Sequence, residues 1–264
     1  FARQSASVAS KLRPFYSGIQ MIEASELFKT FRSVRDLDGL SFKAKDGTVT
    51  ALLGRNGAGK TTTLRIRYTV MRPDTGVALI DGFDTIRDRI EVQNRIGALA
   101  DTRGLYPYLT ARKHIDYYGR LHGLDGAAIA ERVEEFIETL DMIEFADRRD
   151  HGYSKGQALK VALAHALVHR PKNLLLDAPT SGSHIAGKRA VRQLIRDVRD
   201  DGGCVLFCNH SMREVEALAD QIIVIANGRI AESGVHSRGA LRPALAHPPA
   251  NAEGFGARYE TQTR

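Results

Sequence analysis

A glycine-rich segment with one lysine and two hydroxyl side chains is the part of this sequence best suited to chemistry on phosphate groups. Its residues are Gly54, Arg55, Asn56, Gly57, Ala58, Gly59, Lys60, Thr61 and Thr62. The spacing matches G-x-x-x-x-G-K-[ST], in which glycines let successive backbone N–H groups face one anion at the start of a helix. Lys60 can then reach the β- and γ-phosphates, and the Thr61 hydroxyl can ligate Mg²⁺. The segment predicts a site for a nucleoside triphosphate with Mg²⁺.

A carboxylate at the end of an apolar run is the second candidate. Residues 174–176 are three leucines and Asp177 follows them. At the end of a buried strand, Asp177 would hold Mg²⁺ through water or together with the Thr61 hydroxyl. Such a run is common by itself, so its significance depends on the phosphate-binding segment.

The elements that must position these residues alternate between short apolar runs and helical periods, which predicts an α/β fold with a mostly parallel sheet. The clearest strands are residues 49–53, 173–177, 204–208 and 221–226. Apolar residues at helical spacing indicate helices around 129–140 and 191–198. Residues 105–149 carry helical periods without a convincing strand, which indicates a helical insertion. Asn227 and Gly228 predict a tight hairpin turn between two strands.

Composition limits the class of protein. The chain has 264 residues, of which 43% are hydrophobic and 26% charged, so it can form a real core. No apolar run approaches the roughly 20 residues of a membrane-spanning helix. Cys204 and Cys208 lie four apart in a strand-like run, too far apart for a disulfide, which favours a reducing compartment. The net charge of +7 allows anionic partners, but the arginines are dispersed among carboxylates, which makes nucleic acid an unfavoured partner.

The two ends differ from the rest of the chain. Residues 1–20 are rich in serine and basic residues and contain no Asp or Glu, a composition that overlaps with transit peptides. Because Met21 directly precedes the first strand-like segment, an extension or cloning remnant is the favoured interpretation. We expect residues 1–20 to be disordered or non-native, residues 21–234 to form one domain with a helical subdomain at about 105–170, and residues 235–264 to form a flexible tail.

Four motifs occur in a diagnostic order: the phosphate-binding segment, Tyr153-Ser154-Lys155-Gly156-Gln157, residues 174–180, and His210. Over about residues 21–234 this series resembles the ATP-binding subunit of an ABC transporter. The second motif is similar to the family signature L-S-G-G-Q, with Ser154, Gly156 and Gln157 retained. Residues 101–107 and 168–171 are similar to the ATP-binding subunits of sodium-extruding exporters. The resemblance implies a P-loop NTPase fold with a mostly parallel core sheet, an antiparallel β part and a helical insertion.

The resemblance also implies a mechanism and partners. ATP and Mg²⁺ would lie between two ATP-binding subunits in a head-to-tail homodimer or heterodimer, with Ser154, Gly156 and Gln157 reaching the γ-phosphate from the other subunit. The helical insertion would bind a separate membrane permease. The chain would then lie at the cytoplasmic face of the cell membrane, as part of an exporter of ions or small molecules. His210 matches the histidine that senses the γ-phosphate. Phe31 is the candidate to stack on adenine, with Phe28 as a competitor and a core role as the alternative.

Several positions depart from the family pattern near the reacting centre. Ala178 stands where the family has the glutamate that polarises the attacking water, and loss of a general base slows a reaction ~10²- to 10⁴-fold. We therefore expect ATP binding with impaired hydrolysis. His184 replaces an aspartate and is a weak alternative base, while Asp101 replaces a glutamine and can still bind Mg²⁺.

One departure concerns folding rather than chemistry. In the helix expected after the phosphate-binding segment, Leu64, Tyr68 and Met71 form an apolar stripe, and Arg67 falls within it. Burying its guanidinium would cost several kcal/mol unless it reached a carboxylate or solvent. The departures indicate a decayed or altered member of the family. The alternative function, suggested by the charge of +7, is a non-transport regulator or nucleic-acid-associated ATP-binding protein.

Overall fold

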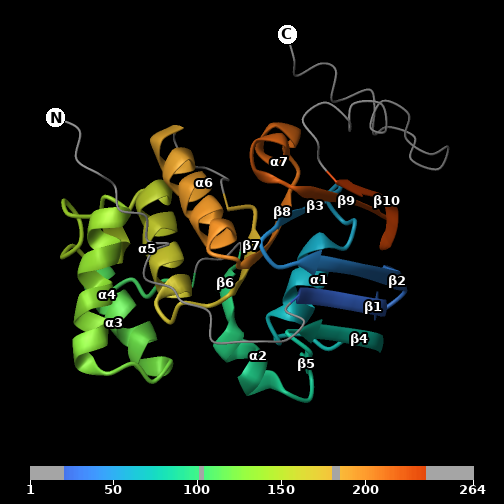
Figure 1. Ribbon diagram of the computed structural model, residues 1–264, viewed down its shortest axis with the longest axis horizontal. Helices are drawn as coiled ribbons and strands as arrows, with labels where there is room; N and C mark the ends of the chain where they lie inside the picture. Colours follow the sequence, from blue (N-terminus) through green and yellow to red (C-terminus); the bar gives the residue numbers. More distant parts are fainter. Residues whose placement is uncertain (1–20, 101–103, 180–184, 236–264) are drawn as a thin grey trace, which may run out of the picture.

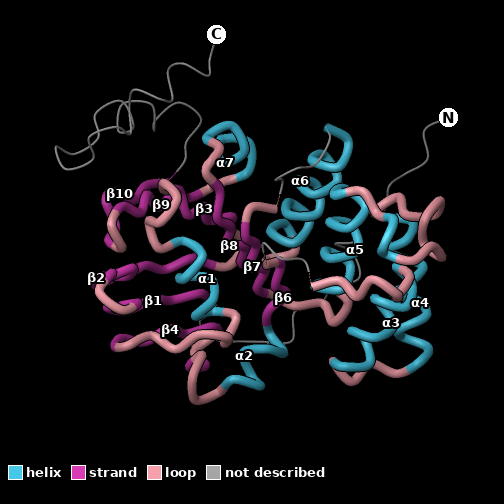
Figure 2. The backbone as a smooth tube through the Cα atoms, turned by 180° about the vertical axis from the view of Figure 1, so that it is seen from behind, coloured by secondary structure: helices cyan, strands magenta, loops and turns pink. Residues whose placement is uncertain are grey.

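In a computed structural model of the protein, residues 21–100, 104–179 and 185–235 are described. They form two sheets flanked by helices (Figures 1 and 2). The expected extension at residues 1–20 and the expected tail, apart from Val235, lie outside the described residues. The same is true of Asp101 and His184.

The larger sheet is mostly parallel, as predicted. Its strands, in the spatial order β10-β9-β3-β8-β7-β6, are β10 (Arg229–Val235), β9 (Gln221–Ala226), β3 (Val49–Leu53), β8 (Cys204–Asn209), β7 (Asn173–Asp177) and β6 (Ile96–Leu99). Every residue of β3 and β8 is buried, as expected for apolar strands covered on both faces. Only β10 runs antiparallel to its neighbour, and the turn before it uses Asn227 and Gly228 at φ +49° and +74°. The four predicted strands and the hairpin are confirmed.

The smaller sheet is the expected antiparallel part. Its strands, in the order β2-β1-β4-β5, are β2 (Val34–Lys45), β1 (Met21–Phe31), β4 (Thr75–Ile80) and β5 (Phe83–Asp84). Alternating residues of β1, such as Ile22 and Ala24, are buried, as expected for a sheet with one face on the core.

Two cores cover the two faces of the parallel sheet. Helix α1 (Lys60–Arg67) lies between the sheets, where Leu64 and Ile66 join a cluster with residues of β1, β2 and the larger sheet. On the other face, α6 (Ile185–Asp200) and α7 (Met212–Leu218) pack in a second cluster with Val49 and Leu53. A short helix, α2 (Arg89–Arg95), leads into β6. Helix α1 therefore begins at the carboxyl end of β3, where parallel strands present their ligand sites.

Between β6 and β7 the described residues form helices joined by turns and loops, and their only β-pairing is an isolated bridge between Thr110 and Arg149. It forms α3 (Ala111–Leu121), α4 (Gly126–Thr139) and α5 (Lys155–Leu167), which lie together at one side of the molecule (Figure 1). In α4 the residues expected from the helical period, including Ile129 and Val133, are buried. The helix predicted around 191–198 is part of α6.

The helix after the phosphate-binding segment is shorter than predicted, because the apolar stripe indicated a helix that extends to Met71. Helix α1 ends at Arg67, and Thr69 adopts φ +63°, a left-handed conformation that does not continue a helix. Met71 therefore lies beyond the helix, although it still packs against the core.

Arg67 is buried and does not reach solvent or a carboxylate. Its side chain is 0% exposed, and Nη1 donates to the Thr63 carbonyl at 2.9 Å. Its guanidinium carbon lies 4.5 Å from the centroid of the Phe42 ring, while Nε and Nη2 have no hydrogen-bond partner among the described residues. Burial lowers the pKa of Arg67 to about 9. The fold thus contains a cation that is only partly compensated, at the opposite end of α1 from the phosphate-binding segment.

Candidate functional site

The phosphate-binding segment sits tightly between β2 and β9. A Cβ atom at Gly54 would lie 2.5 Å from the carbonyl oxygen of Ile225 in β9. Gly59 has φ +99°, and a Cβ there would lie 2.6 Å from the Asp36 carbonyl oxygen in β2. Both glycines are therefore required for close backbone approach, and the loop shape is fixed by the strands around it.

Lys60, the first residue of α1, lies folded over the loop. Its Nζ donates to the carbonyl oxygens of Gly54, at 2.7 Å, and Arg55, at 2.8 Å. Burial lowers the pKa of Lys60, and the neighbouring Asp177 carboxylate acts in the opposite direction. The ammonium group is thereby positioned at the centre of the loop, where an incoming phosphate would meet it.

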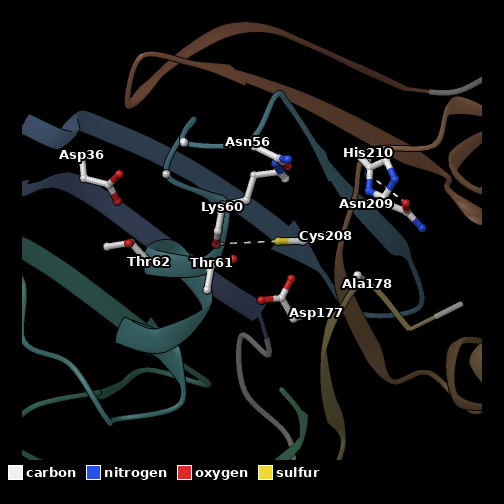
Figure 3. A pocket seen from close by; sticks show the side chains of 12 residues that line it. Asp36, Asn56, Lys60, Thr61, Thr62, Asp177, Ala178, Cys208, Asn209 and His210 are labelled. Atoms are coloured by element: carbon white, nitrogen blue, oxygen red, sulfur yellow. Dashed lines mark hydrogen bonds between the residues drawn. The ribbon is translucent and has the colours of Figure 1, made fainter. Parts of the chain in front are cut away.

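A cavity of about 430 Å³ opens in front of this loop. It gathers residues from four segments (Figure 3), namely Asp36, Asn56, Gly57, Gly59, Lys60, Thr61, Thr62, Asp177, Ala178, Cys208, Asn209 and His210. The structure thus brings most of the predicted loop residues together with Asp177 and His210. Gly54 and Ala58 belong to the loop but do not line the cavity.

Two of the predicted magnesium ligands, Thr61 and Asp177, line the same part of the cavity. Thr61 comes from α1 and Asp177 from the end of β7, and both line the cavity beside Lys60. A hydroxyl and a carboxylate are hard oxygen donors that fit Mg²⁺. The described ranges contain no cluster of three or more His, Cys, Asp or Glu side chains placed to hold a metal ion. An ion here would therefore complete its shell with water and phosphate oxygens.

Ala178 and His210 occupy the end of the cavity near the tips of β7 and β8. Ala178 has φ +47°, and its N–H donates to the Cys208 carbonyl at 3.0 Å. Its methyl group accepts no proton, so the wall that follows Asp177 has no base at this position. Asn209, which sequence reasoning missed, accepts hydrogen bonds at Oδ1 from the N–H groups of His210, at 2.8 Å, and Ser211, at 2.9 Å. This turn directs the chain so that His210 lines the cavity.

The signature-like motif lies away from the cavity of its own chain. Ser154 caps α5: its Oγ accepts from the Gln157 N–H at 3.2 Å, and its N–H donates to Gln157 Oε1 at 2.9 Å. Arg148 also donates to Gln157 Oε1, at 2.8 Å. None of the three predicted signature residues, Ser154, Gly156 and Gln157, is among the described residues that line the cavity. In both views α5 stands with α3 and α4, apart from α1 (Figures 1 and 2).

The aromatic candidates for adenine both belong to β1. Phe31 ends β1 with 42% of its surface exposed, and Phe28 lies against Gly39. Neither lines the cavity. Asp36 does, and no local pattern in the sequence distinguishes it.

Comparisons with known proteins agree with this geometry. A sequence profile of the family described as ABC transporter matches residues 37–181. The ABC transporter ATP-binding protein NatA of Bacillus subtilis is 40% identical over 207 residues, which cover 78% of this chain and 83% of NatA. The daunorubicin/doxorubicin resistance ATP-binding protein DrrA of Streptomyces peucetius is 34% identical over 224 residues, which cover 85% of this chain and 67% of DrrA.

Solved structures share the fold. One described as the ATP binding subunit of an ABC transporter superposes with a TM-score of 0.79 at 22% identity, covering 92% of this chain and all of that one. A dimeric structure of MJ0796, a bacterial ABC transporter cassette, gives a TM-score of 0.75 at 24% identity, covering 81% of this chain and 98% of that one.

Proposed function

The chain belongs to the ABC transporter family, as an ATP-binding domain, and on that premise we propose that it binds Mg-ATP, pairs head-to-tail with a second such domain and drives a separate membrane permease. The observation that carries this proposal is the cavity in front of the phosphate-binding loop. There the Lys60 ammonium, the Thr61 hydroxyl and the Asp177 carboxylate meet around the start of α1. Backbone N–H groups and the helix terminus attract the phosphates, and Lys60 supplies a full charge.

Pairing with a second domain is supported by the position of the signature-like motif. Ser154 and Gln157 are held in a capping box at the start of α5, with backbone N–H groups at a helix terminus available to an anion. Because α5 lies apart from α1 in the same chain, this terminus meets a γ-phosphate only when it belongs to another subunit. Whether the other subunit is a second copy or a related chain, the geometry required is the same.

Slow hydrolysis is the second part of the proposal. Asp177 and His210 line the cavity, which supports roles for them in magnesium binding and in sensing the γ-phosphate. Ala178 supplies no base for the attacking water, a loss that raises the activation barrier by about 3 to 5 kcal/mol. We assign catalytic roles to Asp177 and His210 and a binding role to the loop.

The transport role rests on the family and its relatives. No helix in the described part of the chain is long and apolar enough to cross a membrane. We propose that α3 to α5 contact the permease at the cytoplasmic face of the membrane. DrrA is named for drug resistance, which supports an exporter of ions or small molecules as the complete transporter.

Thermal unfolding with and without Mg-ATP tests the binding proposal. At a free ATP concentration 100 times Kd, binding adds ~2.7 kcal/mol to the free energy of unfolding, which raises Tm. We expect Lys60→Ala to abolish the rise, and Lys45→Ala, at an exposed position outside the cavity, to retain it. If ATP leaves Tm unchanged in the parent, the binding proposal is refuted.

Phosphate release from the same protein tests the second part. Because Ala178 provides no base, we expect release well below one turnover per second. Turnover of several per second would contradict impaired hydrolysis. Sedimentation velocity with and without Mg-ATP then measures pairing of the domains. We expect a dimer only when the nucleotide is present.

A further inference from the structure

Asp36 is placed in the cavity by an irregularity of the antiparallel sheet. In the pairing of β1 with β2, Lys29 lies opposite Leu37 and Thr30 lies opposite Arg35, so Asp36 is the extra residue of a bulge. A bulge redirects the side chain of the unpaired residue. The Asp36 side chain lines the cavity in front of the phosphate-binding loop (Figure 3).

The Asp36 carboxylate has an oxygen with unused hydrogen-bonding capacity. Oδ2 is buried and has no hydrogen-bond partner in the described part of the chain. Arg35, the neighbour of Asp36 in sequence, and Arg229 both pair with Asp38 instead, at 3.0 and 2.6 Å. A buried acceptor without a donor is unfavourable, and a bound triphosphate would add repulsion between its phosphates and this carboxylate. Because the Asp36 side chain lines the cavity, a small rotation of the carboxylate would let a ligand in the cavity supply the donor.

The position of Asp36 along the cavity indicates which donor this is. Asp177, Ala178 and His210 mark the γ-phosphate end, and Asp36 lies beside Thr62 at the opposite end (Figure 3). A triphosphate held by Lys60 and the loop would run from the first end towards the second. The group that follows the α-phosphate is the ribose, whose hydroxyls are hydrogen-bond donors.

We propose that Asp36 is a specificity-determining residue that selects ribonucleoside triphosphates by accepting a hydrogen bond from a ribose hydroxyl. This inference deepens the proposed function and rests on it. A carboxylate that accepts from a sugar hydroxyl is chemically favourable, because hydrogen bonds to charged groups are stronger than neutral ones. The same carboxylate opposes a sugar without hydroxyls, since Oδ2 would then stay unpaired next to the phosphates.

Titration of the full chain with Mg-ATP and with Mg-2′,3′-dideoxy-ATP tests this inference. In the parent protein, we expect ATP to bind about tenfold tighter or more, the ratio that one charge-assisted hydrogen bond supplies. We expect Asp36→Ala to bind both nucleotides with similar affinity. Asp36→Asn, which keeps the shape and a neutral acceptor, should retain an intermediate preference. The two monodeoxy analogues then identify the hydroxyl.

Asp38→Ala is the matched control, because Asp38 lies two residues along the same strand and does not line the cavity. It should retain the parent's preference. Equal binding of both nucleotides by the parent would overturn the role of Asp36 while leaving the nucleotide site intact. Equal tightening of both by Asp36→Ala would show that the carboxylate only repels phosphate, which also overturns it. Failure of both nucleotides to bind would instead refute the proposed function.

Discussion

Replacing Arg67 with methionine should stabilise the protein. Arg67 is fully buried at the end of α1, where no residue that the structure describes accepts a hydrogen bond from Nε or Nη2. Its compensation is one hydrogen bond to the Thr63 carbonyl and the contact with the Phe42 ring. Methionine fills similar space without a charge and makes a favourable sulfur contact with an aromatic ring.

The size of the effect follows from these contacts. The Nε–H and the two N–H groups of Nη2 are three unpaired buried donors, which cost ~1 to 3 kcal/mol each, while a hydrogen bond to a charged group contributes ~1.5 to 3 kcal/mol and a cation–π contact ~1 to 2 kcal/mol. Apolar replacement of buried ionic groups in other proteins stabilises by ~1 to 4 kcal/mol. We therefore expect Arg67→Met to raise the free energy of unfolding by about 2 kcal/mol. For a domain of this size that corresponds to a rise in Tm of about 4 to 8 °C.

Urea unfolding of Arg67→Met, Arg65→Met and the parent measures this difference. Arg65 is exposed on the same helix, so its replacement should change stability by less than ~0.5 kcal/mol. Burial lowers the pKa of Arg67 to about 9, so the unfolded chain binds this proton up to a higher pH than the folded one. The penalty is complete below about pH 9 and declines above it, so the advantage of Arg67→Met should shrink as pH rises above about 9. A variant less stable than the parent at neutral pH would refute this reasoning.

Other predictions concern the cavity and two groups of buried side chains. Ala178→Glu should raise phosphate release ~10²- to 10⁴-fold if the base is all that the site lacks, and an unchanged rate would contradict this. His165 stacks on Tyr118 with ring centroids 4.1 Å apart, and burial lowers its pKa to about 3. Because the unfolded chain takes up this proton near pH 6.5, stability should fall between pH 7 and pH 5, and His165→Phe should reduce that fall in urea unfolding curves. Cys204 and Cys208 are buried with raised thiol pKa values, so a thiol reagent should label them only after unfolding, and rapid labelling of the native protein would be inconsistent with the structure.

The sequence by itself determined the elements and the chemistry of the phosphate-binding loop. The loop is a local pattern, because its shape requires glycine at positions 54 and 59 and its chemistry requires Lys60. All of these residues lie within a few positions of one another. The buried strands and the helix α4 are equally local, since apolar periodicity reports which face of an element meets the core. Asp177 and His210 could be placed because each ends or follows such a strand.

The tertiary structure decided what depends on contacts between distant segments. The burial of Arg67 depends on Phe42 of β2 and on the residues of both sheets that pack around α1. Neither contact can be read from the sequence of α1 itself. Asp36 enters the cavity because β2 bulges where it pairs with β1, and a bulge leaves no periodic signal. The distance of α5 from α1 is likewise a property of the packed fold. Local interactions select helices, strands and turns. Burial and strand pairing depend on contacts between distant parts of the chain, which exist only once the chain has folded.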